Sequence, residues 1–271
     1  MRIPTVRGVI DRRILVNYRV DAECLKAVVP EPFRPQIVAG YAMAGICLIR
    51  LRNLRPRWLP SMLGIGSENA AHRMAVDWEA DGKTHSGVYV PRRDTSSLLN
   101  VIAGGRIFPG KHSLASFTSS EQQDRYRLDM RSRDGETRVS ISGRTACSLP
   151  ENSVFESVAA ASKFFECGSL GYSPSTCENN FDGLELRSFN WQVQPLAVES
   201  VTSSFFEDEQ RFPAGTVEFD HALLMRDIDH QWLSRESISN DSILQNRSVR
   251  NGGAGKPSAL YRLPSVQPDQ L

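Results

Sequence analysis

Short segments that alternate between apolar and polar residues, separated by tight turns, dominate this sequence and constrain its fold most. Residues 10–20, IDRRILVNYRV, alternate as a strand with one buried face requires. The segments 72–91 and 113–146 each contain an Asp-Gly dipeptide between two such runs, and this dipeptide is typical of a β-hairpin turn. We therefore predict a mainly β protein, a β-rich α+β fold.

Few segments have the periodicity of a helix. Residues 153–166 open with a serine and a glutamate in the spacing of a capping box, and a shorter helix is expected after Asp21. Many short strands with few helices indicate an antiparallel barrel or sandwich. No internal repeat is visible, so we expect one domain over residues 1–236. Residues 237–271 are polar, rich in Gly, Pro and Ser and without periodicity, and we expect this tail to be disordered.

The composition argues against several classes of function. The hydrophobic content of 40% and the charged content of 23% are those of a globular protein. A net charge of +1 offers no general attraction for nucleic acid or an acidic membrane, and the longest apolar run, residues 40–49, is too short to cross a bilayer. Five scattered cysteines without a C-x-x-C pair, and no evident signal peptide, favour a reduced cytoplasmic protein.

Polar side chains concentrate in three segments where a strand-rich protein would normally place apolar ones, residues 66–73, 89–97 and 106–117. A carboxylate, paired guanidinium groups and an amine or imidazole can together bind a small carboxylate or oxoacid. The sequence therefore predicts a small-molecule carboxylate as the partner. The candidate catalytic residues are Glu68, His112 and Lys111, and the candidate substrate-binding residues are Arg92, Arg93, Asn69, His72 and Arg73.

Each candidate also has an ordinary structural interpretation. Arg92 and Arg93 can pair with Asp94 across a loop, where such contacts contribute little. Glu68 can cap a turn, and Lys111 follows a Pro-Gly dipeptide that is typical of a solvated turn. The five histidines lack the spacing of metal ligands, and neither a phosphate-binding glycine loop nor a nucleophile elbow is present. No metal and no cofactor is expected.

Four segments, taken in order, resemble acetoacetate decarboxylase. Residues 18–33, YRVDAECLKAVVPEPF, resemble its N-terminal signature, and residues 67–76, SENAAHRMAV, resemble the segment with its active-site glutamate. Residues 107–112, IFPGKH, resemble its lysine segment, and residues 218–228, EFDHALLMRDI, its Phe-Asp-His-Ala stretch. The resemblance implies an antiparallel, barrel-like fold with a few short helices and a central pocket.

The similarity is closer to the YqjF-like family, an uncharacterised bacterial group in the acetoacetate decarboxylase-like superfamily. Its members are similar in the stretches RRILVNYRVD, GICLIRL, SENAAHR, GVYVPRRDTSS, SSFF and ALLMRDI. The similarity spans roughly residues 3–235, and the chain is identified as a member of this group.

The decarboxylase reaction needs a lysine of lowered pKa, because only a neutral amine attacks a carbonyl to form a Schiff base. Alignment of Pro109 with the proline of the decarboxylase places Gly110 at the Schiff-base lysine and Lys111 next to it. Alignment of the downstream LASF instead places His112 near that position. Neither register gives Lys111 the position of the nucleophile, so we predict that Lys111 forms no Schiff base.

The resemblance supports a pocket with a glutamate and arginines. Glu68 falls at the glutamate position with one residue of slack, and the N-terminal arginine of the decarboxylase falls near residues 11–13. We expect an enzyme acting on a small oxo- or hydroxy-acid without a Schiff base, with Glu68 as acid/base and Arg92 or Arg93 holding the carboxylate. The alternative is a non-catalytic protein that binds a small ligand, and a lesser one is a Schiff-base decarboxylase using Lys111. The oligomeric state stays open, a homo-oligomer included.

Overall fold

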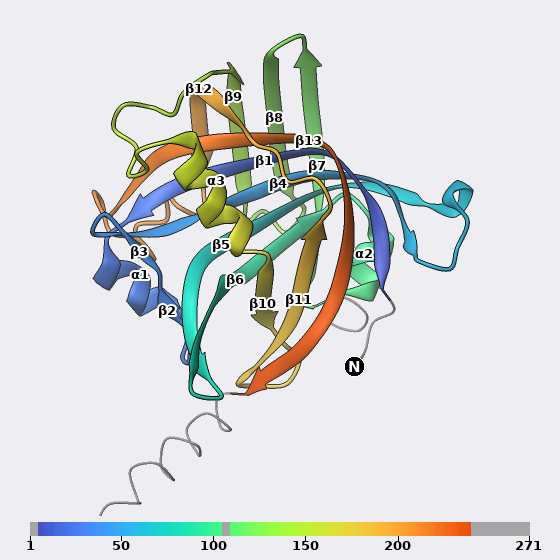
Figure 1. Ribbon diagram of the computed structural model, residues 1–271, viewed down its shortest axis with the longest axis horizontal. Coiled ribbons are helices and arrows are strands. Elements are labelled where there is room, and N and C mark those ends of the chain that lie inside the picture. Colours follow the sequence, from blue (N-terminus) through green and yellow to red (C-terminus); the bar gives the residue numbers. More distant parts are fainter. Residues whose placement is uncertain (1–4, 105–108, 240–271) are drawn as a thin grey trace, which may run out of the picture.

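The fold is that of a computed structural model, which describes residues 5–104 and 109–239 (Figure 1). The sequence predicts a disordered tail over residues 237–271, and the residues from 240 onward lie outside the described part of the chain. Residues 237–239 are described, and they form the end of the last strand, so this strand continues three residues beyond the boundary expected from the sequence.

The prediction of a mainly β fold with a few short helices is confirmed. Within the described residues the elements are β1 (Val6–Val20), α1 (Ala22–Val28), β2 (Arg34–Pro35), β3 (Ile37–Val38), β4 (Tyr41–Pro56), the 3-10 helix η1 (Ser61–Leu63), β5 (Ile65–Ala80), β6 (Lys83–Thr95), α2 (Leu98–Ala103), β7 (His112–Gln122), β8 (Arg125–Ser132), β9 (Arg138–Thr145), α3 (Val158–Cys167), β10 (Leu170–Pro174), β11 (Asn180–Ser188), β12 (Gln194–Ser203) and β13 (Val217–Ser239). None of the described helices has the length and apolar character that a membrane crossing requires.

The strand pairings close into two circuits that share five strands, β13, β1, β4, β5 and β6. The first circuit is completed by β7, β8, β9 and β12, and the second by β10 and β11. This branching is possible because β6 and β13 are long enough to change partners along their length. In Figure 1, β13 leaves the side of β12 and arches over to β11.

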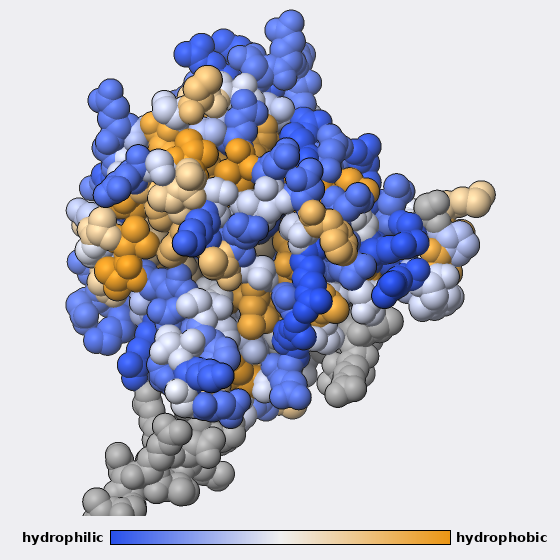
Figure 2. Space-filling model, in the orientation of Figure 1, coloured by the Kyte–Doolittle hydropathy of each residue, from blue (hydrophilic) through white to orange (hydrophobic). Residues whose placement is uncertain are grey.

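Each face of the five shared strands packs on a separate apolar core. On β1 and β4, Val16 and Ile46 belong to the first core, which also contains residues of β8, β9 and β12. Their neighbours Leu15 and Cys47 belong to the second core, together with Phe165 of α3 and Leu186 of β11. Successive residues of a strand point to opposite faces, so adjacent residues of the shared strands enter different environments. Figure 2 shows mostly hydrophilic side chains on the outer face of the molecule, with smaller apolar patches between them.

The turns and helix starts follow local sequence chemistry. Asp81 and Gly82 have positive φ angles of 50° and 74° in the hairpin between β5 and β6, as an Asp-Gly turn requires. The third helix begins later than the sequence predicts, because Ser157 rather than Ser153 caps it by accepting a hydrogen bond from the backbone of Ala160. The hydroxyl of Ser153 instead donates to Asp220 at 2.7 Å, which ties the segment before the helix to β13.

Close contact between β1 and β4 leads to a first prediction. A Cβ atom at Gly45 would lie 2.2 Å from the carbonyl oxygen of Val16, and both backbones are fixed in the shared strands. We expect Gly45→Ala to lower the free energy of unfolding by about 3 kcal/mol, the upper end of ordinary overpacking costs. Gly168→Ala is the control, because the added Cβ meets its nearest atom at 3.5 Å. Urea denaturation of both variants checks this, and equal stabilities would contradict it.

Candidate functional site

A cavity of about 100 Å³ lies within the second circuit. Every strand of that circuit except β10 contributes to its wall, and so does the segment that leads into β7. Much of the wall is apolar, formed by side chains such as Ile49, Leu186 and Trp232. An apolar cavity with a few converging polar groups is the usual form of a small-molecule site.

Arg93 of β6 lines this cavity without a carboxylate partner among the described residues. Its Nε donates to the hydroxyl of Ser173 at 3.2 Å, and Ser173 is itself fully buried. Burial lowers the pKa of Arg93 to about 10, and the nearby Cys47 sulfur opposes this shift when it is ionised. The guanidinium group therefore remains a cation at neutral pH in surroundings that do not neutralise it.

Arg13 of β1 is the second cation in the wall, and it is also without a described carboxylate partner. Its Nε donates to Cys47 Sγ at 3.1 Å, and its guanidinium group lies 5.8 Å from the ring centre of Trp191. A weaker contact joins Nη1 to the sulfur of Met225 at 4.0 Å. Sulfur atoms and an aromatic face hold Arg13 in position but supply no formal negative charge.

His112, the first residue of β7, lies half-buried beside Arg93 in the same wall. Its Nδ1 lies 3.2 Å from the carbonyl oxygen of Gly110, which can only accept, so Nδ1 carries the proton and Nε2 keeps a lone pair. Burial, and then the charge of Arg93, lower the pKa of His112 to about 4, against a small opposing effect of the Gly110 bond. His112 is therefore a neutral imidazole with a proton acceptor at neutral pH.

Asn69 also faces the cavity, and it connects the sheet to α2. Its Oδ1 accepts from the hydroxyl of Thr95 at 2.7 Å and from Asn100 of α2 at 3.4 Å, while its Nδ2 donates to the hydroxyl of Ser67 at 2.9 Å. The helix that these bonds anchor precedes the segment with His112. Asn69 therefore positions the cavity wall, and most of its own hydrogen-bonding capacity is used.

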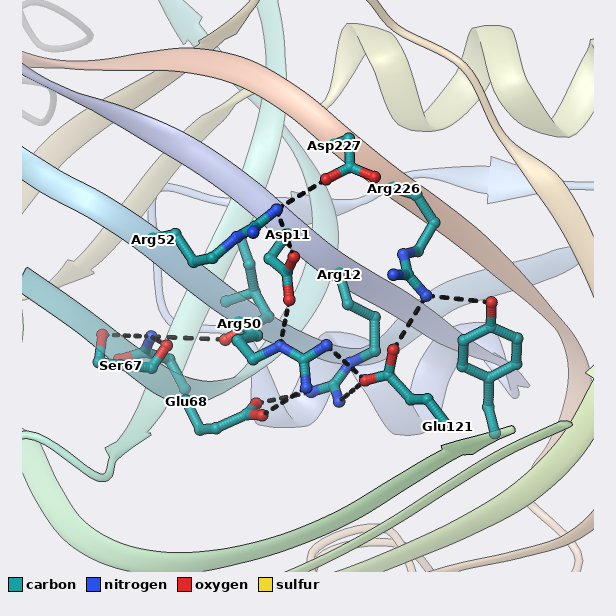
Figure 3. Close-up of polar contacts among 12 residues, drawn as sticks. Asp11, Arg12, Arg50, Arg52, Ser67, Glu68, Glu121, Arg226 and Asp227 are labelled. Atoms are coloured by element: carbon teal, nitrogen blue, oxygen red, sulfur yellow. Dashed lines mark hydrogen bonds and ion pairs between the residues drawn. The ribbon is translucent and has the colours of Figure 1, made fainter. Parts of the chain in front are cut away.

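Glu68 lies on the other face of the shared strands, in an ion-pair cluster (Figure 3). Arg12, which is 1% exposed, pairs with Glu68 at 2.6 Å and with Glu121 of β7 at 3.0 Å. Arg50 pairs with Glu121 at 2.6 Å and Arg226 with the same carboxylate at 2.9 Å. Glu68 is not among the residues that line the cavity, and its charge is already balanced by arginines.

Arg92, His72 and Lys111 are also absent from the cavity wall. Arg92 pairs with buried Asp94 at 2.8 Å and reaches Asp134 and Glu136, so the ordinary interpretation of a loop ion pair describes its contacts. His72 is fully buried with its ring centre 4.4 Å from that of Phe205, and burial lowers its pKa to about 3. Lys111 is exposed, as expected for a residue at a solvated turn.

Arg73 is buried near the cavity but is not part of its wall. Its Nη2 donates to Asn17, its guanidinium group lies 4.8 Å from the ring centre of Phe165, and its Nε has no described partner. Burial lowers the pKa of Arg73 to about 10, ionised Cys47 opposes this, and Arg13 adds to it. Arg73 is a third arginine near Cys47 without a described carboxylate partner.

The structure therefore brings together Asn69, Arg93 and His112 and separates them from Glu68 and Arg92. It also adds two groups that sequence reasoning missed or left open. Arg13 was one of three neighbouring candidates, and only its position on the strand distinguishes it from Arg12. Cys47 carried no signal, because a lone cysteine in an apolar run is typical of a core residue. No group of three or more potential metal-ligating side chains occurs within the described residues.

A family model described as an uncharacterized conserved protein, DUF2071, matches residues 10–214. The chain belongs to the DUF2071 family. The match confirms the family resemblance read from the sequence. No curated protein matches the chain.

Solved structures extend the relation of this DUF2071 chain to the acetoacetate decarboxylase-like fold. The acetoacetate decarboxylase of Legionella pneumophila superposes with a TM-score of 0.60 at 11% identity, covering 88% of each chain. The enduracididine biosynthesis enzyme MppR, solved with pyruvate, gives 0.57 at 10% identity over 89% of this chain and 91% of its own. An acetoacetate decarboxylase-like enzyme from Sphingomonas wittichii gives 0.52 at 10% identity over 86% and 93%. At such identities the likeness shows the fold alone.

The two kinds of arginine lead to a second prediction. Arg12→Met leaves Glu68 and Glu121 with one cation fewer, and we expect it to cost about 3 kcal/mol of unfolding free energy. Arg93→Met deprives no described carboxylate of a partner and removes a partly buried charge, so the free energy of unfolding should stay equal or rise. Urea denaturation of both variants without added ligand measures this. Equal losses would show that Arg93 has a structural role.

Proposed function

We propose that this protein binds a small carboxylic acid, of the oxo- or hydroxy-acid class, in the cavity lined by Arg13 and Arg93. The observation that carries the proposal is the presence of both guanidinium groups in an apolar wall, without a carboxylate partner among the described residues. Both arginines are partly buried, and removing a cation from water is costly unless the cation is paired. A bound carboxylate would supply the missing charge and could accept several N–H groups from each arginine.

The size of the cavity limits the ligand. A volume of about 100 Å³ in this measure corresponds to roughly half a dozen water-sized positions. That is enough for an acid of about six heavy atoms, such as pyruvate, but not for a nucleotide. The apolar remainder of the wall, including Leu184 and Ile49, suits a short carbon chain next to the carboxylate.

His112 favours a catalytic role over simple binding. A neutral imidazole with a free Nε2 lone pair is a general base, and its place beside Arg93 would put it near the C3 protons of a bound 2-oxo acid. The two arginines would stabilise the negative charge of an enolate formed by proton removal. We therefore favour proton-transfer chemistry on an oxo-acid, with Arg13 and Arg93 as binding residues and His112 as the base.

Schiff-base chemistry at Lys111 finds no support in this geometry, because the lysine is exposed and none of the described wall residues is a lysine. The relatives support the substrate class in a general way. MppR has been solved with pyruvate and with the condensation product of pyruvate and imidazole 4-carboxaldehyde. Pyruvate is accordingly a reasonable first probe. Glu68 is better assigned to the ion-pair cluster than to catalysis.

Thermal unfolding with added ligand tests the binding proposal. Pyruvate should raise the melting temperature and the neutral analogue pyruvamide should not; at a hundredfold excess over Kd the gain is about 2.7 kcal/mol. Arg93→Gln should weaken pyruvate binding by roughly a hundredfold, because one charged hydrogen-bond partner is lost. Arg144→Gln, an exposed arginine on β9, is the control and should behave as the unaltered protein. Equal stabilisation of both variants, or by both compounds, would refute the proposal.

Hydrogen exchange at C3 of pyruvate in D₂O, followed by proton NMR, tests the catalytic step. His112→Asn should reduce the protein-dependent exchange rate by about a hundredfold or more. Because the pKa of His112 is lowered to about 4, the base stays unprotonated, so the rate should be nearly level from pH 5 to pH 8. An ordinary histidine would instead lose most of its activity between about pH 7 and pH 5. Pyruvate binding without any exchange would favour the non-catalytic alternative.

A further inference from the structure

Cys47 lies in the wall of the cavity and is surrounded by arginines. It belongs to β4, is 7% exposed and accepts a hydrogen bond from Arg13 Nε at 3.1 Å. A guanidinium group that donates to a sulfur stabilises the negative charge of a thiolate. Cys47 takes no part in the ion pairs of the cluster around Glu68.

The strand register places a second arginine on the same row. Cys47 pairs with Ala71 of β5, and Ala71 pairs with Arg93 of β6. The small side chain of Ala71 lies between the two and is itself part of the cavity wall. Neighbouring strands are about 4.8 Å apart, so Arg93 lies two strands from the sulfur on the same row, with its Nε held by Ser173. An ionised Cys47 raises the pKa of Arg93, as expected when the two groups are near each other.

Arg73 is the third cation near this sulfur and gives an independent indication of an unmet charge. It is 7% exposed, and its Nε is buried without a described hydrogen-bond partner. An ionised Cys47 also raises the pKa of Arg73, against the larger effect of burial. Arg13 therefore contacts the thiol and two further arginines lie in its neighbourhood. None of the three pairs with a described carboxylate, since Asp94, the acidic residue of the cavity wall, pairs with Arg92.

We propose that Cys47 is the nucleophile of this cavity and reacts reversibly with the carbonyl carbon of a 2-oxo acid whose carboxylate Arg13 and Arg93 hold. The sulfur gives up its proton and forms a bond to C2. The π electrons of the carbonyl move to its oxygen, which takes up one proton, so the thiol and the ketone add to a hemithioketal with no other product. Reversal releases both unchanged. This inference rests on the carboxylate site proposed above.

The other cysteines provide internal references. Cys147, Cys167 and Cys177 are exposed free thiols, and none of them lines the cavity. Cys24 is partly buried and contacts the hydroxyl of Thr216 and the backbone carbonyl of Arg211 rather than a guanidinium group. A reagent that depends on the arginines will therefore distinguish Cys47 from the remaining thiols of the same molecule.

The experiment compares alkylation by iodoacetate and iodoacetamide on the full chain, with the extent at each cysteine read by peptide mass spectrometry. The rate of alkylation by iodoacetate, divided by the rate with iodoacetamide, should be at least tenfold higher at Cys47 than at Cys147. Arg93→Gln should reduce this preference about tenfold, while Arg144→Gln should leave it unchanged. An unmodified Cys47, or a relative ratio of one, would overturn the proposal.

Carbon-13 NMR of [2-¹³C]pyruvate separates failure of this inference from failure of the carboxylate site. With the unaltered protein, a resonance of a tetrahedral carbon should appear at the expense of the carbonyl. Cys47→Ala should abolish that resonance and reduce, but not eliminate, the stabilisation by pyruvate in thermal unfolding, because Arg93 still holds the carboxylate. Stabilisation without any tetrahedral resonance would refute Cys47 as the nucleophile and leave the binding proposal standing. Absence of stabilisation would refute the carboxylate site itself.

Discussion

The alternation of side chains along the five shared strands determines the rest of this structure. Both circuits use the same strands, so each face of these strands must serve a different interior. Two residues that are neighbours in the sequence therefore face the interiors of two different circuits. The doublets of polar residues divide in this way, with one member in ion pairs or solvent and the other in the cavity wall: Arg12 and Arg13, Glu68 and Asn69, Arg92 and Arg93, and Lys111 and His112.

The two faces differ in how they treat charge. On the face of the first circuit, Arg12 and Arg92 meet carboxylates at hydrogen-bonding distance. On the other face, Arg13 and Arg93 meet sulfur and a hydroxyl, so their desolvation is not offset by an opposite charge. A protein that only needed stability would place apolar side chains there. This cost in stability is reasonable where an anion binds, because each unpaired cation then strengthens the binding of the ligand.

The sequence predicts the strand-rich fold, the turn at Asp81 and the family, because these depend on local patterns that survive without tertiary information. It does not predict which member of a doublet faces the cavity. The register shifts between Ile10 and Arg12 and between His72 and Met74, and such bulges change the facing of all later residues without a distinct sequence signal. The start of α3 was placed too early for a similar reason, since the contact of Ser153 with Asp220 is a tertiary one.

The segment before β7 agrees with the proposal of a site without a Schiff-base lysine. Gly110, which one register aligns with the Schiff-base lysine, has a φ of 77°, and a Cβ there would lie 2.8 Å from Cβ of Ser173. A lysine would be strained at this position and would displace the serine that holds Arg93. The glycine instead lets the backbone approach closely and present its carbonyl to His112. The same backbone turn thus disfavours a lysine at residue 110 and positions a neutral imidazole in the wall that also contains the two arginines, which is consistent with the proposed base chemistry.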